Sequence, residues 1–512
     1  MALFCSYLIL SLITQAMHNS ALTLLRNWIT ADNPRLAMTG VLFVIVVAGV
    51  LVGAVFGTLG PIISIGLIGA VLVGILMLRS TQVGLTVMIA LICLLPYGAL
   101  PFKVGFRPTF LDVALVALFA VWLLRLITGQ QRTFITSPLG PLVFFFQGWA
   151  VFIFIFGLRY GGLNVTIARN FLEVLLAVSL FFLIINQVRT LKQLNQISRA
   201  IILAGGGTAL LGIFFYVIPE TWSIQLLSLL RVFQYPTEGI LRYIEDNPEQ
   251  PMRAISTSID PNALGGLLVF LTIISVTYLF SKQPVMPRRY LFLIAAMTSL
   301  TLYLTFSRGS LLGVIAGLGI ISLLRYRKLV WLMIAVAAMM VVLPQTQVYV
   351  ERFVEGIRGQ DLATQMRFGE YKDAFNLISR YPLTGVGFFG TPDIDVYVGV
   401  SSVYLLLAQQ LGIVGAGLYA LIGLVYLVIV FTMIHRLPSD HPLETPLLAY
   451  GAAILGAMIG GVFDHFYFNL TFIHIAAFYW LTIGLGMVAV LLRRQELEPR
   501  AKGDSRVSTH RQ

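Results

Sequence analysis

Residues 262–281 read NALGGLLVFLTIISVTYLFS and contain no charged side chain. A helix rises about 1.5 Å per residue, so this stretch is long enough to cross the roughly 30 Å of hydrocarbon in a bilayer. Similar apolar runs recur along the 512-residue chain, which is 58% hydrophobic and 11% charged. No soluble fold could bury so much apolar surface. The sequence therefore predicts an all-α polytopic integral membrane protein and excludes soluble enzymes, secreted disulfide scaffolds and disordered chains.

We expect about 14 transmembrane helices, within a range of 12–14, separated mostly by short loops. The expected spans fall near residues 36–58, 61–79, 83–96, 109–128, 140–157, 168–187, 199–218, 262–281, 289–306, 310–325, 329–344, 402–432, 446–463 and 468–492.

The distribution of basic residues predicts the orientation. An even number of spans puts both termini on one side, and with that side inside, the inner loops hold 21 basic residues and the outer loops 13. Lys and Arg concentrate in cytoplasmic loops, so both termini are expected to be cytoplasmic. The net charge of +12 and the isoelectric point of about 9.7 then report topology, and nucleic acid is not needed as a partner.

The expected organisation has five parts. Residues 1–35 are a cytoplasmic N-terminal segment, either an interfacial helix or an overlong start, and residues 36–218 form an N-terminal transmembrane bundle. An outer loop spans residues 219–261. A second membrane region covers residues 262–492 and includes a large, partly helical outer loop near residues 345–400, and residues 493–512 form a basic cytoplasmic tail.

Four arginines on the expected outer face lie at or just above helix ends: Arg169, Arg253, Arg308 and Arg367. The guanidinium fork binds two oxygens of a phosphate at once and stays charged. The same residues could instead be interfacial anchors that reach toward lipid headgroups. Arg308 fits the anchor interpretation least, because only Ser307 to Ser310 separate two apolar spans, and a charge near hydrocarbon needs a partner anion.

The region around these arginines resembles the O-antigen ligase and O-antigen polymerase superfamily of bacterial membrane glycosyltransferases. The matching pieces occur in the family's order over about residues 250–420. They are Asp260 to Gly266, Phe306 to Leu312, the segment from Arg367 to the Pro382-x-x-Gly385-x-Gly387 ending, Ser401 to Leu405, and Gln410 to Gly415.

The resemblance implies transfer of a glycan from a polyprenyl-diphosphate carrier to a hydroxyl of a glycan or lipid acceptor. It places the protein in the bacterial cytoplasmic membrane, in surface polysaccharide assembly, with other assembly proteins as further partners. By analogy Arg253, Arg308 and Arg367 would bind the diphosphate, with Arg169 as a weaker candidate, and Asn262 and Tyr404 would contact glycan or acceptor. No metal or cofactor is expected.

One departure from the family concerns the base. The family usually has His-Asn where this chain has Ser401-Ser402, and serine is no comparable base at neutral pH. Outer-face candidates for the base are His465, Asp464, Asp395 and Asp393. The pair His465 and Asp464 is the most suggestive, since a carboxylate orients an imidazole and raises its basicity.

Two alternatives to a ligase or polymerase remain open. A flippase or transporter of lipid-linked oligosaccharide would be expected to carry ionisable residues near the bilayer midplane and internal repeats, and the sequence shows neither. An inactive relative that binds carrier lipid is kept open by the serine at position 401.

Overall fold

A computed structural model describes residues 33–59, 74, 76–77, 80–103, 105–131, 133–390 and 399–508. The chain forms two compact units, Met1–Ile75 and Leu76–Gln512. The first unit contains α2 (Pro34–Leu59). The expected span at 61–79 lies mostly outside the described residues, as do Asp393 and the candidate base Asp395.

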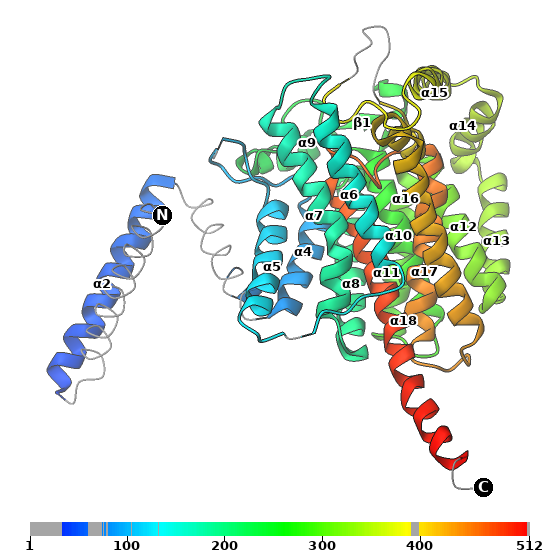
Figure 1. Cartoon of the computed structure of the whole chain (residues 1–512). Coiled ribbons are helices and arrows are strands. Elements are labelled where there is room, and N and C mark those ends of the chain that lie inside the picture. The colour runs from blue at the N-terminus through cyan, green and yellow to red at the C-terminus, as the bar shows by residue number, and fades with distance from the viewer. Residues whose placement is uncertain are drawn as a thin grey trace. The chain divides into compact units, whose positions relative to one another are not determined.

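The second unit is a bundle of helices with a few short elements in its loops (Figure 1). Its helices are α4 (Thr81–Leu94), α5 (Phe110–Ile127), α6 (Gly140–Gly157), α7 (Val165–Gln187), α8 (Leu191–Val217), α9 (Glu220–Leu229), α10 (Pro261–Phe280), α11 (Arg288–Leu304), α12 (Arg308–Leu324), α13 (Lys328–Val342), α14 (Gln347–Arg358), α15 (Leu362–Arg380), α16 (Val403–His435), α17 (Glu444–Phe463) and α18 (Ile473–Ser508). Strands β1 (Arg242–Tyr243) and β2 (Met252–Arg253) pair antiparallel, and the 3-10 turns are η1 (Leu230–Phe233), η2 (Ile244–Asp246) and η3 (Pro344–Thr346).

The prediction of an all-α polytopic membrane protein is confirmed. Among the described residues, eight helices are long and apolar enough to cross a membrane, or nine if the bent pair Lys328–Val342 and Gln347–Arg380 counts as one span. The expected number of 14 spans is therefore not established. Several expected spans form helices of only 14 to 17 residues, including α4 and α12, which are short for a crossing on their own.

The core of the second unit is built around α10 and α18, whose apolar windows are both 89% buried. The stretch at 262–281 that sets the fold class thus lies inside the bundle, where α8, α11, α12 and α17 pack around it. Glycines let two of these helices approach closely: a Cβ on Gly313 of α12 would lie 2.6 Å from the backbone oxygen of Gly456 on α17. Such contacts replace the hydrophobic driving force that is missing between helices in lipid.

The long loops gather at one end of the bundle, which we call the loop end. It carries α9, β1, β2, α14 and α15, drawn at the top of Figure 1. The large loop near residues 345–400 is partly helical, as expected, and its helices are α14 and α15. On α15 the buried residues are Ala374 and Leu377, whereas Phe368 and Phe375 are 59% and 60% exposed.

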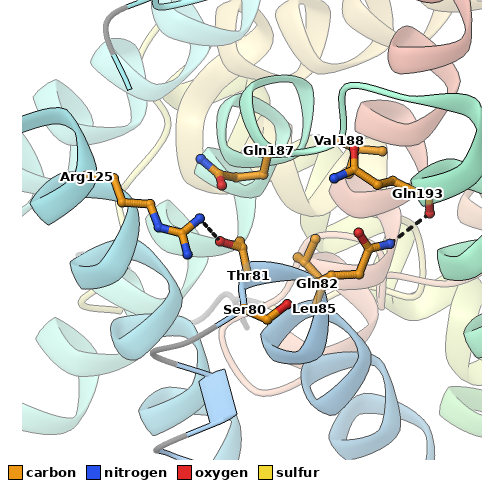
Figure 2. Close-up of a pocket in the computed structure, with 8 residues that line it drawn as sticks. All are labelled: Ser80, Thr81, Gln82, Leu85, Arg125, Gln187, Val188 and Gln193. Carbon is orange, nitrogen blue, oxygen red and sulfur yellow. Dashed lines mark hydrogen bonds between the residues drawn. The ribbon is translucent and has the colours of Figure 1, made fainter. Parts of the chain in front are cut away.

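A polar cavity of about 220 Å³ lies at the opposite end, where α4 and α8 begin and α5 and α7 end (Figure 2). Arg125 donates to the hydroxyl of Thr81 at 2.7 Å, and the Gln82 amide donates to the backbone oxygen of Gln193 at 3.0 Å. Apart from Arg125, the side chains that line this cavity are uncharged. None of Arg169, Arg253, Arg308 and Arg367 lines it.

Candidate active site

Four arginines lie within electrostatic reach of one another or of Asp464 at the loop end, and we call them the arginine cluster: Arg253 on β2, Arg308 at the start of α12, Arg352 on α14 and Arg367 on α15. Three of them were predicted from the sequence, and Arg352 was not. The two loop helices bring their arginines over the positions where the membrane helices α10 and α12 begin. Residues far apart in the sequence thus combine their charges in one place.

Strained backbone leads into two of these helices. Ile259 and Phe306 have φ of +63° and +52°, in the left-handed region that residues with a Cβ rarely adopt. Ile259 precedes Asp260, whose carboxylate accepts from the N–H groups of Asn262 and Ala263 and caps α10. Phe306 lies two residues before Arg308. Strained backbone persists only where the surrounding structure holds it in place, and it is found mostly at functional sites.

Arg253 is held deep in the loop end by neutral oxygens. Its Nε donates to the backbone oxygen of Thr305 at 2.8 Å and its Nη2 to the side-chain oxygen of Asn262 at 2.5 Å. Burial lowers the pKa of Arg253 to about 10, although Asp260 nearby opposes the shift. The guanidinium is still charged at neutral pH, and a bound anion would relieve the cost of burying it. Asn262, predicted to contact glycan, directs Arg253 in this structure.

Arg308 bridges the membrane helices and the large loop. Its Nη2 lies 2.6 Å from a carboxylate oxygen of Asp361, which is 4% exposed, and its Nη1 donates to the backbone oxygen of Arg352 at 2.8 Å. Burial works against ionised Asp361, but the hydrogen bonds from Arg308 and Thr364 lower its pKa. The partner anion expected for Arg308 is therefore supplied by the protein, which fixes where the guanidinium points.

Arg352 is the arginine that the sequence interpretation missed. Its Nη1 is buried and has no hydrogen-bond partner in the described part of the chain. Burial, and then the charge of Arg308, lower its pKa. A signal was present: Tyr349, Arg352 and Gly356 are spaced three and four residues apart, so they share one face of α14. A buried donor without a partner calls for a ligand or water.

The charges of Arg367 and Arg253 both affect the pKa of Asp464, the residue that follows α17. Burial raises the pKa of Asp464 to about 7, while the charges of Arg367 and Arg253 oppose the shift and Asp260 adds to it. No hydrogen bond or salt bridge of Arg367 is found among the residues described. The arginine cluster therefore lies beside a carboxyl group, that of Asp464, which changes charge near neutral pH. A general base needs a pKa in this range.

His465 lies beside Asp464, as the sequence predicts. Its Nδ1 is 3.8 Å from an Asp464 carboxylate oxygen, too long for a hydrogen bond, and the atom is buried without a partner in the described structure. Burial lowers the pKa of His465, so the imidazole is neutral at pH 7. The pKa of Asp464 near 7 and the charges of Arg253 and Arg367 beside it make Asp464 the stronger candidate base, with His465 as its neighbour.

The segment around Ser401, where the family has His-Asn, is hydrogen-bonded to α15. A Glu370 carboxylate oxygen accepts from the Ser401 N–H at 2.8 Å, and the Tyr371 hydroxyl lies 3.4 Å from the Ser401 backbone oxygen. Glu370 was not singled out from the sequence. Its contact with Ser401 holds α15, and with it Arg367, beside the start of α16.

The remaining predicted site residues lie in other contacts. Arg169 lies 2.6 Å from Asp112 and 2.5 Å from Glu173, and its described contacts do not reach the arginine cluster. Tyr404 donates its hydroxyl to the backbone oxygen of Met458 at 2.9 Å, which links α16 to α17. Within the described residues, no group of three or more His, Cys, Asp or Glu side chains could hold a metal.

The ionisation of Asp464 gives a stability prediction. Its folded pKa of about 7 exceeds the ordinary 3.8, so between those values the folded state binds more protons than the unfolded chain, and stability falls as pH rises. We expect the melting temperature of Asp464→Asn to be close to that of wild type at pH 5. At pH 8 the variant should melt about 2–4 °C higher than wild type. A difference that does not change between pH 5 and pH 8 would contradict this assignment.

The fold and the site define a multi-pass α-helical membrane protein whose loop end gathers arginines around a buried carboxyl group. The O-antigen ligase family model matches residues 293–420, which confirms the predicted resemblance to the O-antigen ligase superfamily. The matched segment contains Arg308, Arg352 and Arg367, whereas Arg253 and Asp464 lie outside it. No curated protein matches the chain. The match supports an O-antigen ligase-like membrane glycosyltransferase.

Proposed function

We propose that the protein transfers a glycan from a polyprenyl-diphosphate carrier to an acceptor hydroxyl, on the outer face of the bacterial cytoplasmic membrane and with both termini in the cytoplasm. The observation that carries the proposal is the arginine cluster beside Asp464. A diphosphate brings several negative charges, and each charge-assisted hydrogen bond contributes on the order of 1.5–3 kcal/mol. The carrier bond is already activated, so the reaction needs no nucleotide.

In the proposed reaction the acceptor oxygen forms a bond to the anomeric carbon of the donor sugar. The bond between that carbon and the diphosphate oxygen breaks, and the diphosphate leaves with the bonding electrons. Asp464 takes the proton of the acceptor hydroxyl. The arginine cluster stabilises the charge that develops on the leaving group, since fixed cations cost no reorganisation during the reaction.

The test uses purified full-length protein with a polyprenyl-diphosphate-linked glycan and its acceptor, in EDTA. We expect glycosylated acceptor and free polyprenyl diphosphate as products. Wild-type protein that binds the donor and forms no product would refute the transferase and favour the inactive relative that Ser401 keeps open. If EDTA abolishes transfer and added metal restores it, the reaction needs a metal ion. That result would refute transfer by these side chains alone.

Gly356→Ala tests the position of Arg308 without removing a charge. A Cβ at Gly356 would lie 2.0 Å from the Arg308 Nη1, so the guanidinium has to move. We expect transfer to fall about 10- to 100-fold, because a misplacement of about 1 Å is that costly in a preorganised site. Gly369→Ala on α15 is the matched control, since a Cβ there meets no atom within 4 Å. Equal rates for the two variants would show that the placement of Arg308 is not critical.

A further inference from the structure

A second cavity, of about 200 Å³, opens at the loop end, and neither the arginine cluster nor Asp464 and His465 line it. It lies between the starts of α5, α7 and α18 and the loop that follows α4. Its lining includes Tyr97, Asp112, Arg169, Asn170, Glu173 and His474. Polar and aromatic side chains thus surround a space that lies outside the arginine cluster.

Two carboxyl groups flank the guanidinium group that lines this cavity. Arg169 lies between Asp112 and Glu173, and the two carboxylate side chains are only 12% and 8% exposed. Asp112 also accepts from the Thr109 N–H at 2.6 Å. The Arg169 guanidinium is already paired by these two groups, so it is a poor site for an anion such as a diphosphate. The carboxyl oxygens can accept hydrogen bonds from a ligand that donates them.

Unpartnered polar groups independently point to a ligand. His474 is 2% exposed and lines the cavity, yet its Nε2 makes no hydrogen bond to the described residues. The Arg169 Nε is also buried and makes no hydrogen bond to the described residues. Asn170, which also lines the cavity, has no hydrogen bond among the described contacts. Buried polar groups are almost always paired in folded proteins, so the His474 and Arg169 nitrogens, together with the half-buried Asn170 amide, have hydrogen-bonding capacity left for a bound molecule.

A row of rings joins this cavity to the candidate base. The His465 and Phe472 ring centroids are 5.8 Å apart, Phe472 and His474 are 6.4 Å apart, and His474 and Tyr97 are 5.1 Å apart. Asp260, the cap of α10, also lies close enough to Tyr97 to add to the raised pKa that burial gives its hydroxyl. The cavity therefore lies on the Asp464–His465 side of the active site, where the acceptor hydroxyl would be activated.

We propose that this cavity binds one sugar residue of the acceptor glycan, a unit or more away from the hydroxyl that reacts. The proposal rests on the proposed function. Sugar hydroxyls donate to carboxylates and accept from Arg and Asn, and Tyr97 and His474 add ring edges and faces. The volume is below the roughly 300 Å³ at which pockets for drug-sized ligands begin, which suits a single sugar ring.

Kinetics test the acceptor assignment. Glu173→Gln keeps the shape of the side chain and replaces one carboxyl oxygen with an amide nitrogen, and Asn170→Ala removes an amide that no described residue binds. Both variants should raise the acceptor KM about tenfold, the loss of about one hydrogen bond, with a donor KM within about twofold of wild type. Gln82→Ala, in the cavity at the opposite end, is the matched control. A raised donor KM, or no change in either KM, would overturn the proposal.

A binding measurement separates this proposal from the proposed function. Saturation-transfer NMR would be recorded on wild-type protein in nanodiscs with methyl glucoside, methyl galactoside and N-acetylglucosamine. We expect at least one sugar to give a signal that weakens severalfold in Glu173→Gln and Asn170→Ala and persists in Gln82→Ala. No signal in wild type, or an equal signal in both cavity variants, would overturn the sugar site. If wild type transfers no glycan, the proposed function fails and this measurement alone decides about the cavity.

Discussion

Arg308→Ala is expected to reduce glycan transfer about 10²–10³-fold, the usual cost of removing one fixed donor that stabilises charge in a transition state. Arg308 begins α12 and reaches α14 through the backbone oxygen of Arg352 at 2.8 Å. Its loss removes a cation from the cluster and leaves the carboxylate of Asp361 buried without its guanidinium. The defect should appear mainly in kcat, because the leaving diphosphate gains charge only as the carrier bond breaks.

The control for this prediction is Arg358→Ala, at the exposed C-terminal end of α14, which should keep its transfer rate. Arg308→Lys should recover only part of the loss, since an ammonium group cannot reproduce the planar fork that reaches Asp361 and α14 together. Initial rates and melting temperatures would be measured for all three variants. Full activity in correctly folded Arg308→Ala would remove Arg308 from the proposed mechanism.

Asp464→Asn is expected to reduce transfer about 10²–10⁴-fold, the usual range for loss of a general base. In wild type, burial raises the pKa of Asp464 to about 7. The base acts only when ionised, so kcat/KM should rise with pH through about 7 and then level off. The variant should lose this rise along with most of its rate.

His465→Ala separates the two neighbouring candidates. If Asp464 is the base, this variant should keep the same pH midpoint with a smaller loss of rate, because the 3.8 Å between the Asp464 oxygen and Nδ1 is not a hydrogen bond. If His465→Ala instead abolishes the rise near pH 7 while Asp464→Asn retains it, the imidazole is the base and our assignment is wrong.

The sequence predicted the fold class because the apolar runs leave few alternatives. The stretch at 262–281 needs a nonpolar environment along its whole length, and it forms α10 in the middle of the bundle. The number of spans was less predictable. Apolar content shows that a helix avoids water, but it does not show whether a helix as short as α12, with 17 residues, crosses the bilayer alone.

For the candidate site, the sequence pointed to Arg253, Arg308 and Arg367, because guanidinium groups beside apolar spans are unusual. Their convergence could not be predicted, since it depends on how α14 and α15 fold back over the starts of α10 and α12. Arg169 has the same local signature, yet it lies between Asp112 and Glu173 and makes no described contact with the arginine cluster. Local pattern identifies a charge near the membrane, and only tertiary packing decides which partner the charge finds.

The most direct test of the account is to follow both products of one reaction. Purified wild-type protein with an authentic polyprenyl-diphosphate-linked glycan and acceptor should release one free polyprenyl diphosphate for each glycan transferred, and Arg308→Ala should slow both products equally. Glycan transfer without release of the diphosphate carrier, or equal rates of release in wild type and Arg308→Ala, would contradict the claim that the arginine cluster stabilises a diphosphate leaving group.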